Sequence, residues 1–344
     1  MKFRNYMILA AMALLGLAAC KDDDAPKFPE EKTSDMTGFA KGADVSWLTQ
    51  MEKSGILFYD SLGRQKECMH ILRDLGVNSI RLRVWVNPED GWCNASDVLV
   101  KALRAKDLGM RVLIDFHYSD TWADPANQTK PAAWKDLSFA DLKTAVASHT
   151  ADVLKKLKDN GVDVEWVQVG NETRNGMLWA DGKASDNMQN YADLTTAGYD
   201  AVKTVYPNAK VIVHIDNGFD NNLYRWIFDG LTQYGAKFDV IGMSLYPSVD
   251  NWQTLNQQCL ANMNDMVSHY GKEVMICEVG FAASEGIQAK AFLSDLVAKA
   301  KSVSNNKCLG IFYWEPQAYN GWQSYLLGAF DDQGKPTAAL DAFK

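Results

Sequence analysis

Glu165-Trp166-Val167-Gln168-Val169-Gly170-Asn171-Glu172 is the stretch that decides the fold. Valine and tryptophan dominate its first five residues and helical patterns flank it, which is typical of a parallel strand buried on both faces. The stretch closes on a carboxylate, which is costly to bury unless it is paired or protonated. In barrels of alternating strands and helices, catalytic groups lie at this end of the strand. We therefore interpret Glu172 as a functional residue, with capping of the next helix as the alternative.

A second stretch, residues 273–280, repeats this pattern of an apolar run that closes on a glutamate, here Glu278. The joints between helices and strands also repeat, because a glycine stands between a helical pattern and a strand pattern at five places. Glycine is favoured where a helix ends in a left-handed residue, so the recurrence indicates a repeated strand–helix unit. The five glycines are Gly76, Gly109, Gly161, Gly235 and Gly271.

The whole chain can be divided into such units. Strands are predicted at residues 39–46, 77–85, 111–117, 165–172, 210–216, 240–246, 273–279 and 309–314, and helices at residues 65–75, 96–108, 139–158, 187–205, 222–234, 254–269 and 287–301, with a short closing helix at 337–343. Eight strands with helices between them predict a (β/α)8 TIM barrel of the α/β class. A doubly wound sheet is the alternative, but residues 41–45 do not form the glycine-rich phosphate turn that it needs.

Composition supports a globular chain and argues against one class of partner. Hydrophobic residues make up 47% of the 344 residues and charged residues 23%, as in folded proteins. The net charge of −8 argues against nucleic acid, whose recognition needs a basic face. The 11 tryptophans are either core residues or flat platforms for sugars.

The N-terminus is interpreted as a targeting segment. Residues 1–19 have a positive end and an apolar run, as in a signal peptide. They lead into Leu17-Ala18-Ala19-Cys20, which resembles a lipobox, so Cys20 is the predicted lipidation site; an ordinary secretory peptide is the alternative. The acidic residues 22–24 resemble the surface-export signal of Bacteroidetes lipoproteins. We predict a lipid-anchored outer membrane protein at the cell surface, or alternatively at the periplasmic face, with a tether at residues 20–36 and the catalytic domain at 37–344.

Five cysteines remain after Cys20, and no C-x-x-C pair occurs. They are interpreted as small buried apolar residues. Strand alternation predicts that Cys277, one residue before Glu278, points to the helical layer. A disulfide is compatible with an exported protein, but the sequence assigns none.

Polar and aromatic residues follow the predicted strands, where a packed core would use valine, isoleucine and leucine. Two strand-end carboxylates are the minimum needed to break a glycosidic bond, one as a proton donor and one ionised as a nucleophile. Arg81 and Tyr246 are placed to hold Glu278 ionised, Asn171 to bind the sugar 2-OH, and Trp314 to form the floor. The strand-end set is Asp44, Arg81, Arg83, Asp115, His117, Asn171, Glu172, His214, Asp216, Tyr246, Glu278, Trp314 and Glu315.

A metal site is the competing chemistry. Asp115 and His117, with His214 and Asp216, offer ligands for a divalent ion. The strand ends hold no H-x-H pair, and the two glutamates already account for hydrolysis. We therefore predict no metal site.

Several segments resemble clan A glycoside hydrolases, and within them the endo-β-1,4-galactanases of family 53. They include residues 41–46, residues 76–88, Gly170-Asn171-Glu172 through Trp179, residues 214–218 and residues 312–316. The most specific is His117-Tyr118-Ser119-Asp120-Thr121-Trp122-Ala123-Asp124-Pro125. Ala180 departs from the family pattern, which has proline there.

The resemblance implies retaining endo-hydrolysis of β-1,4-galactan, as in the type I arabinogalactan side chains of pectin. Glu172 would be the acid/base and Glu278 the nucleophile, with Trp122 and Asp124 joining the strand-end residues around the substrate. No cofactor is implied. Family members often bind calcium in the last two strand-end loops, but residues 281–285 lack the Asp-x-His-x-Asn run, so calcium is not predicted. A monomer is expected, with the membrane contacted through the lipid only.

Two alternatives stay open at this point. One is a clan A enzyme acting on another β-linked polysaccharide, such as mannan or glucan. The other is a non-catalytic surface glycan-binding lipoprotein, which would be expected to have lost a carboxylate.

Overall fold

The computed structural model describes residues 35–344. The predicted signal peptide and Cys20 lie outside these residues, so the predicted segment boundaries stay a prediction. In the described part of the chain, no helix is both long enough and apolar enough to cross a membrane.

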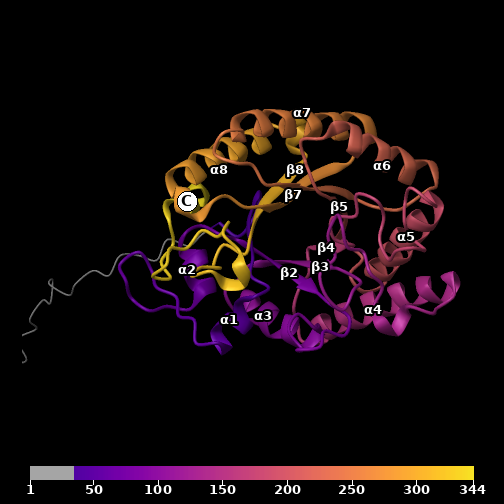
Figure 1. Ribbon diagram of the computed structural model, residues 1–344, viewed down its shortest axis with the longest axis horizontal. Helices are drawn as coiled ribbons and strands as arrows, with labels where there is room; N and C mark the ends of the chain where they lie inside the picture. Colours follow the sequence, from indigo (N-terminus) through magenta and orange to yellow (C-terminus); the bar gives the residue numbers. More distant parts are fainter. Residues whose placement is uncertain (1–34) are drawn as a thin grey trace, which may run out of the picture. The chain divides into compact units, whose positions relative to one another are not determined.

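Eight parallel strands close into one barrel in the order of the sequence, which confirms the predicted fold (Figure 1). The ladders run from each strand to the next, and β8 returns to β1 with Asp44 opposite Trp314. The strands are β1 (Ala40–Asp44), β2 (Ser79–Val84), β3 (Arg111–Phe116), β4 (Trp166–Val169), β5 (Lys210–Ile215), β6 (Val240–Leu245), β7 (Glu273–Val279) and β8 (Cys308–Trp314).

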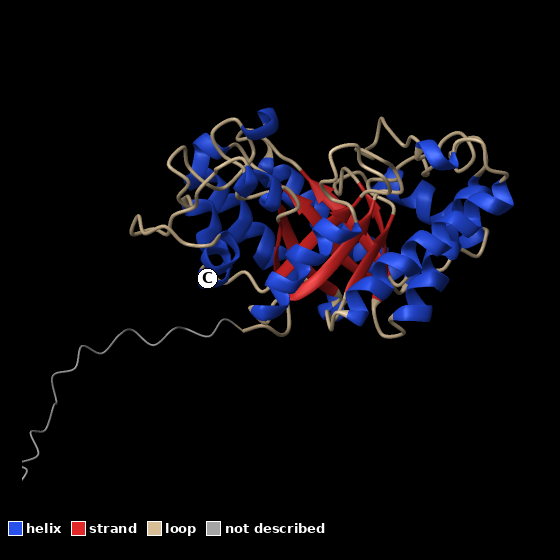
Figure 2. Ribbon diagram, turned by 90° about the horizontal axis from the view of Figure 1, so that it is seen from below, coloured by secondary structure: helices blue, strands red, loops and turns tan. Residues whose placement is uncertain are grey.

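Helices surround the barrel as an outer layer, and Figure 2 shows the strands enclosed by them. They are α1 (Leu48–Lys53), α2 (Cys68–Asp74), α3 (Ala95–Asp107), α4 (Phe139–Asp159), α5 (Met188–Val205), α6 (Asn221–Gln233), α7 (Trp252–Tyr270) and α8 (Gly286–Lys301). The short helix α1 was not predicted, because its six residues carry too little apolar periodicity. The predicted closing helix is a 3-10 helix at Ala338–Phe343.

The five predicted glycine joints are confirmed, because each glycine has a positive φ. Gly76 shows why no other residue fits there. Its φ is 94°, and a Cβ at this position would lie 2.2 Å from the carbonyl oxygen of Phe343. The joint after α2 therefore also packs against the end of the chain.

The apolar residues form two cores. A large one fills the space between strands and helices. A small one, with Trp166, Ile212 and Phe312 among its members, fills the inside of the barrel.

Cys277 belongs to the inner core, so the prediction that it points to the helical layer is wrong. Met275 belongs to the same inner core and Ile276 to the outer one, so the alternation of side chains holds up to Cys277. The register of β7 then shifts between Ile276 and Val279, and this bulge lets the next residue, Glu278, reach the mouth of the barrel as well. The five described cysteines are buried and free, as predicted for small apolar residues.

Candidate active site

Glu278, near the end of β7, is held by two partners at the mouth of the barrel. Its Oε1 lies 2.8 Å from Nη2 of Arg81, and its Oε2 accepts a hydrogen bond of 2.8 Å from the hydroxyl of Tyr246. The glutamate is 5% exposed. Both oxygens therefore have a partner that favours the ionised form.

Arg81 is fully buried and organises the site from β2. Besides Glu278, its guanidinium contacts Asp44 at 2.6 Å and Asp115 at 2.9 Å. It also donates to Oε1 of Gln168 at 2.7 Å and to Oδ1 of Asn171 at 3.0 Å. Burial raises and Arg81 lowers the pKa of Asp115, and the net result lies below its usual range.

Glu172 follows β4 in a backbone conformation that is rare for glutamate, with φ of 47°. Such strained residues cluster at functional sites. Its Oε1 lies 2.6 Å from Oγ of Ser244, which donates to it. The backbone of β4 leaves the ladder after Val169, and this turn directs Glu172 to the mouth of the barrel.

The two glutamates differ in what stabilises their charge. Burial raises the pKa of Glu278 to about 7, while Arg81 and Tyr246 oppose that rise. Burial, together with the charge of Glu278, raises the pKa of Glu172 well above its usual range. Among residues 35–344, no cationic side chain pairs with Glu172, so Glu278 ionises first and Glu172 keeps its proton. That division matches an anionic nucleophile beside a protonated acid.

Two predicted histidines hold the site together. Nδ1 of His117 accepts from the ring N–H of Trp85 at 3.2 Å and from the backbone N–H of Ala123 at 3.1 Å. Its Nε2 therefore carries the hydrogen and faces Asp115 at 3.0 Å. His214 lies 2.8 Å from Ser244 through its Nε2.

Tryptophans line one wall of the mouth. Trp314, the last residue of β8, packs edge-on against Trp47 with ring centroids 5.0 Å apart. Arg83 is buried beneath them, and its guanidinium carbon lies 4.4 Å from the ring centre of Trp122. Glu315 pairs with Arg83 and also accepts from the backbone N–H of Trp47, so this third carboxylate is occupied by structural contacts.

A cavity of about 400 Å³ lies between the glutamates and this wall. A second hollow of about 680 Å³ shares Trp47 and Trp122 with it and is also lined by Trp85 and Trp92. Two adjoining hollows lined by tryptophans form a groove that fits a chain of sugars rather than one small molecule. The first cavity is lined by Trp47, His117, Trp122, Ala123, Asp124, Asn171, Glu172, Tyr246, Glu278, Trp314, Gln323, Ser324 and Tyr325.

Asp124 and Asp216 lie at the edge of the catalytic pair. Asp124 lines the first cavity but uses Oδ1 to accept from the backbone of Ala126 at 2.7 Å. Asp216 forms a two-pronged pair with Arg174, at 2.9 and 2.8 Å. Asp124 thus lines the groove without contacting the two glutamates, whereas Asp216 is paired with Arg174 and is not among the residues that line it.

Ser244 and Gln168 were missed at the sequence level. Strand alternation could have indicated them. Ser244, for example, stands two residues before Tyr246 and therefore points to the same side. Arg174 lies in a loop, where no periodicity reveals its partner.

The four residues of the alternative metal site do not come together as ligands. Asp115 is committed to Arg81 and His117, and Asp216 to Arg174. Within residues 35–344, no group of three or more His, Cys, Asp or Glu side chains is arranged to hold a metal ion.

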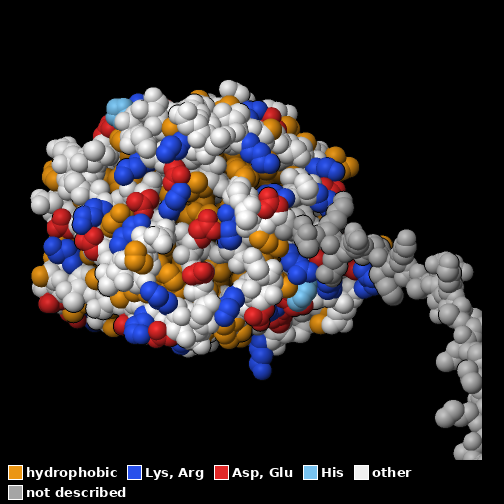
Figure 3. All heavy atoms as spheres, turned by 180° about the vertical axis from the view of Figure 1, so that it is seen from behind, with side chains coloured by type: hydrophobic (Ala, Val, Ile, Leu, Met, Phe, Trp, Pro, Cys, Tyr) orange, Lys and Arg blue, Asp and Glu red, His pale blue; other side chains and the backbone are white. Residues whose placement is uncertain are grey.

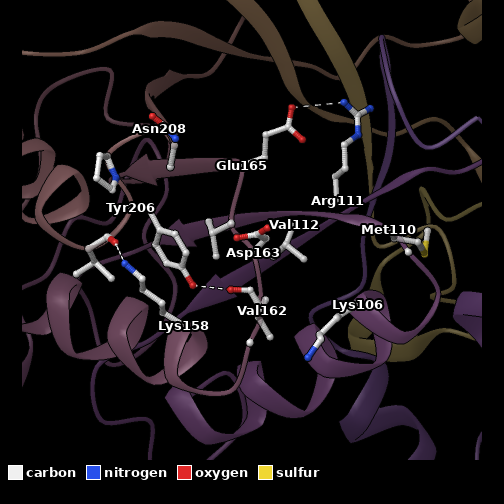
Figure 4. A pocket seen from close by; sticks show the side chains of 16 residues that line it. Lys106, Met110, Arg111, Val112, Lys158, Val162, Asp163, Glu165, Tyr206 and Asn208 are labelled. Carbon is white, nitrogen blue, oxygen red and sulfur yellow. Dashed lines mark hydrogen bonds and ion pairs between the residues drawn. The ribbon is translucent and has the colours of Figure 1, made fainter.

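A larger hollow of about 820 Å³ lies at the opposite end of the barrel, beside the starts of β3, β4 and β5. Figure 4 shows its side chains: Arg111 faces Glu165, and the hydroxyl of Tyr206 reaches the carbonyl of Val162. Basic and acidic side chains are interspersed over the face in Figure 3. This hollow lacks a pair of buried carboxylates, so it is not the candidate active site.

The chain is similar to known glycosidases. The profile of Glycosyl hydrolase family 53 matches residues 40–288. A protein of Neosartorya fischeri named probable arabinogalactan endo-beta-1,4-galactanase A is 38% identical over 298 residues, which cover 80% of this chain and 83% of that protein.

Solved structures agree with the sequence match. One of two fungal beta-1,4-galactanases superposes with a TM-score of 0.82 at 29% identity, over 89% of this chain and 99% of that one. The family 53 catalytic domain of Ignisphaera aggregans gives a TM-score of 0.80 at 32% identity, over 93% and 97% of the two chains. Together with the profile, these similarities show that the chain belongs to glycosyl hydrolase family 53.

Proposed function

We propose that the chain is a retaining endo-β-1,4-galactanase that cleaves galactan and type I arabinogalactan. The observation that carries this function is the unequal glutamate pair. Glu278 is held between a cation and a hydroxyl donor, while Glu172 contacts the hydroxyl of Ser244 and no cation in the described part of the chain. The named family relatives supply the substrate class.

The mechanism follows from the two environments. The carboxylate of Glu278 attacks the anomeric carbon, the glycosidic C–O bond breaks, and Glu172 gives its proton to the departing oxygen. A galactosyl ester on Glu278 results. Glu172, now ionised, takes a proton from water, whose oxygen attacks the anomeric carbon and releases Glu278. Two displacements at one carbon retain the β-configuration.

The surrounding residues position these groups. Arg81 and Tyr246 fix the two oxygens of Glu278. Asn171 lies between Arg81 and the carbonyl of Ala123, so its amide is fixed beside the sugar site. Trp314 offers a flat surface to the apolar face of a galactosyl ring.

The proposal is tested with a panel of polysaccharides and the release of reducing ends from each. Hydrolysis of β-1,4-galactan, with no hydrolysis of mannan or glucan, is the expected result. Preference for mannan or glucan would favour the alternative that the chain is a clan A enzyme acting on another β-linked polysaccharide. Binding to galactan without new reducing ends would favour a glycan-binding protein.

We also propose that the enzyme is a Bacteroidetes-type lipoprotein attached to the outer membrane through Cys20 and exposed on the cell surface. This proposal rests on residues 17–24 of the sequence. Cys20→Ala should move the enzyme from the membrane fraction to the soluble fraction, and external protease should reach the unchanged protein on intact cells. An unchanged protein that is already soluble would refute the anchor, and protection from protease would favour the periplasmic face.

A further inference from the structure

His214 lies between a fixed donor and a fixed acceptor. Its Nδ1 is 2.9 Å from Nε2 of Gln168 and 3.0 Å from Oδ1 of Asn171. Its Nε2 is 2.8 Å from Oγ of Ser244, and that oxygen is 2.6 Å from Oε1 of Glu172. The ring therefore connects the polar interior of the barrel to the proposed acid.

Arg81 sets the orientation of both amides. Its Nε donates to Oε1 of Gln168, so the amide nitrogen of Gln168 must face His214. Its Nη2 donates to Oδ1 of Asn171, whose nitrogen donates to the carbonyl of Ala123 at 2.8 Å. Neither amide can turn over without losing these contacts. Nδ1 of His214 thus faces one N–H group and one carbonyl oxygen.

The two neutral forms of His214 are not equal in this position. With the hydrogen on Nδ1, one N–H of Gln168 would be left without an acceptor in a fully buried site, which is costly. With the hydrogen on Nε2, that N–H is accepted by Nδ1; Oδ1 of Asn171 then receives no hydrogen from the ring but keeps its bond from Arg81. Burial, with the charge of Arg81, holds the pKa of His214 well below its usual range, so the ring is neutral.

From this geometry we infer that His214 is a positioning residue for the acid/base, acting through Ser244. The hydrogen on Nε2 of His214 points to Oγ of Ser244, and the hydroxyl hydrogen of Ser244 therefore points to Oε1 of Glu172. The donors run in one direction: Gln168, His214, Ser244, Glu172. No proton moves along this chain.

The direction of the hydrogen bonds from Gln168 to Glu172 decides which oxygen of Glu172 carries the catalytic proton. Because Oε1 already accepts from Ser244, the acid proton must reside on Oε2. That leaves Oε1 as the fixed oxygen and Oε2 as the oxygen that exchanges protons with the substrate and with water. The inference rests on the proposed function and adds to it the device that orients the acid.

Several other groups act on Glu172 and must be considered in a pH experiment. The charge of Glu278 on β7 and of Asp216 after β5 raises its pKa, and Arg81 on β2 lowers it. In turn, the negative charge of Glu172 contributes to raising the pKa of the hydroxyls of Tyr246 and Tyr224. His214 is faced by Arg81, Asp115 and His117. A single change at Ser244 leaves all of these side chains in place.

The first test is the pH profile of kcat/KM for Ser244→Ala on galactan. Ser244 stabilises the ionised form of Glu172, so its loss raises the pKa of Glu172 and moves the alkaline limb to higher pH. A shift of about one pH unit is expected, because a hydrogen bond to a charged group changes ionisation by roughly tenfold. The kcat should fall while KM stays the same, since the group lost positions the acid and does not touch the sugar.

Two variants serve as controls. Ser244→Thr keeps a hydroxyl and should restore the unchanged alkaline limb. Thr150→Val removes another buried hydroxyl, which lies 2.7 Å from the hydroxyl of Tyr118 and away from the glutamates. It should lower stability and leave the pH profile unchanged. An alkaline limb that stays in place or moves down in Ser244→Ala would overturn the inference.

The second test is independent of activity. Nitrogen-15 NMR of the five histidines, with His214 assigned by its loss in His214→Gln, should show Nε2 protonated and Nδ1 bare. A hydrogen on Nδ1 would overturn the inference even in an active enzyme. An enzyme that does not cleave galactan would refute the proposed function, whereas the NMR result would still decide the direction of the hydrogen bonds.

Discussion

Strand β4 has a glutamate at each end, and the two lie in opposite surroundings. Glu165, before the first residue of β4, has a side chain that is 44% exposed and contacts Arg111 at 3.5 Å. It lines the hollow of about 820 Å³ in Figure 4. Glu172, beyond the last residue of β4, lies in the smaller cavity of about 400 Å³, with Glu278 in the same wall.

The comparison teaches that volume does not mark the active site of this barrel. At the amino end, charged side chains reach water and pair locally. At the carboxyl end, Arg81, Asp44 and Asp115 are fully buried, and Arg81 pairs with both carboxylates. Buried and mutually oriented charges shift the pKa values of the glutamates between them, and such shifts are typical of catalytic sites.

The largest effect is expected from Glu278→Ala. No other group can attack the anomeric carbon, so hydrolysis of galactan should fall by about 10⁶-fold, the scale seen when a hydrolase loses its nucleophile. Reducing-end release measures it. Glu165→Ala is the matched control at the other end of the barrel and should keep full activity. Comparable losses in the two variants would destroy the contrast between the ends.

Glu172→Ala should have the next largest effect, but only on substrates that need a proton. Loss of general acid catalysis should slow galactan hydrolysis by about 10² to 10⁴-fold. An aryl galactooligosaccharide with an activated leaving group needs no proton, so its first step should proceed at nearly the normal rate in a stopped-flow burst. Equal losses on both substrates would show that Glu172 is not the acid.

Tyr246→Phe should change the pH dependence more than the maximal rate. The hydroxyl of Tyr246 lowers the pKa of Glu278, so its removal raises that pKa. Because Glu278 must be ionised to attack, the acid limb of kcat/KM should move to higher pH by up to about one unit. A limb that moves to lower pH, or does not move, would mean that this hydroxyl does not stabilise the carboxylate.

The smallest effect is expected from a chelator. The charges at the carboxyl end of the barrel are supplied by protein side chains. The loop Phe281-Ala282-Ala283-Ser284-Glu285 lacks the calcium-binding run of related enzymes. Incubation with EDTA should leave both the rate and the thermal midpoint unchanged. A lower midpoint that added calcium restores would show a calcium site in this chain and correct the prediction.

The sequence was sufficient for the barrel and for most of its mouth. Glycine joints and strand-end polar residues recur with each strand–helix unit of the sequence. Closure of the barrel then brings the strand-end residues together at one end. Arg81 and Tyr246 were predicted as partners of Glu278 for that reason, and each of them contacts it.

The remaining features depend on geometry that periodicity does not carry. The bulge in β7 brings Glu278 to the mouth of the barrel although its neighbour Cys277 faces the inner core, and no residue type in the sequence indicates such a bulge. The pair of Arg174 and Asp216 joins a loop to a strand end. The direction of the hydrogen bonds at His214 depends on how Arg81 orients two amides, which only coordinates show.

Azide rescue of the two alanine variants tests the central claim most directly, since it reports which face of the sugar each glutamate occupies. In Glu172→Ala, the galactosyl ester on Glu278 forms from an activated aryl substrate, and azide in place of the missing base should give the β-azide. In Glu278→Ala, azide in place of the missing nucleophile should give the α-azide. The α-azide from Glu172→Ala together with the β-azide from Glu278→Ala would contradict the account, because the two glutamates would then have exchanged roles.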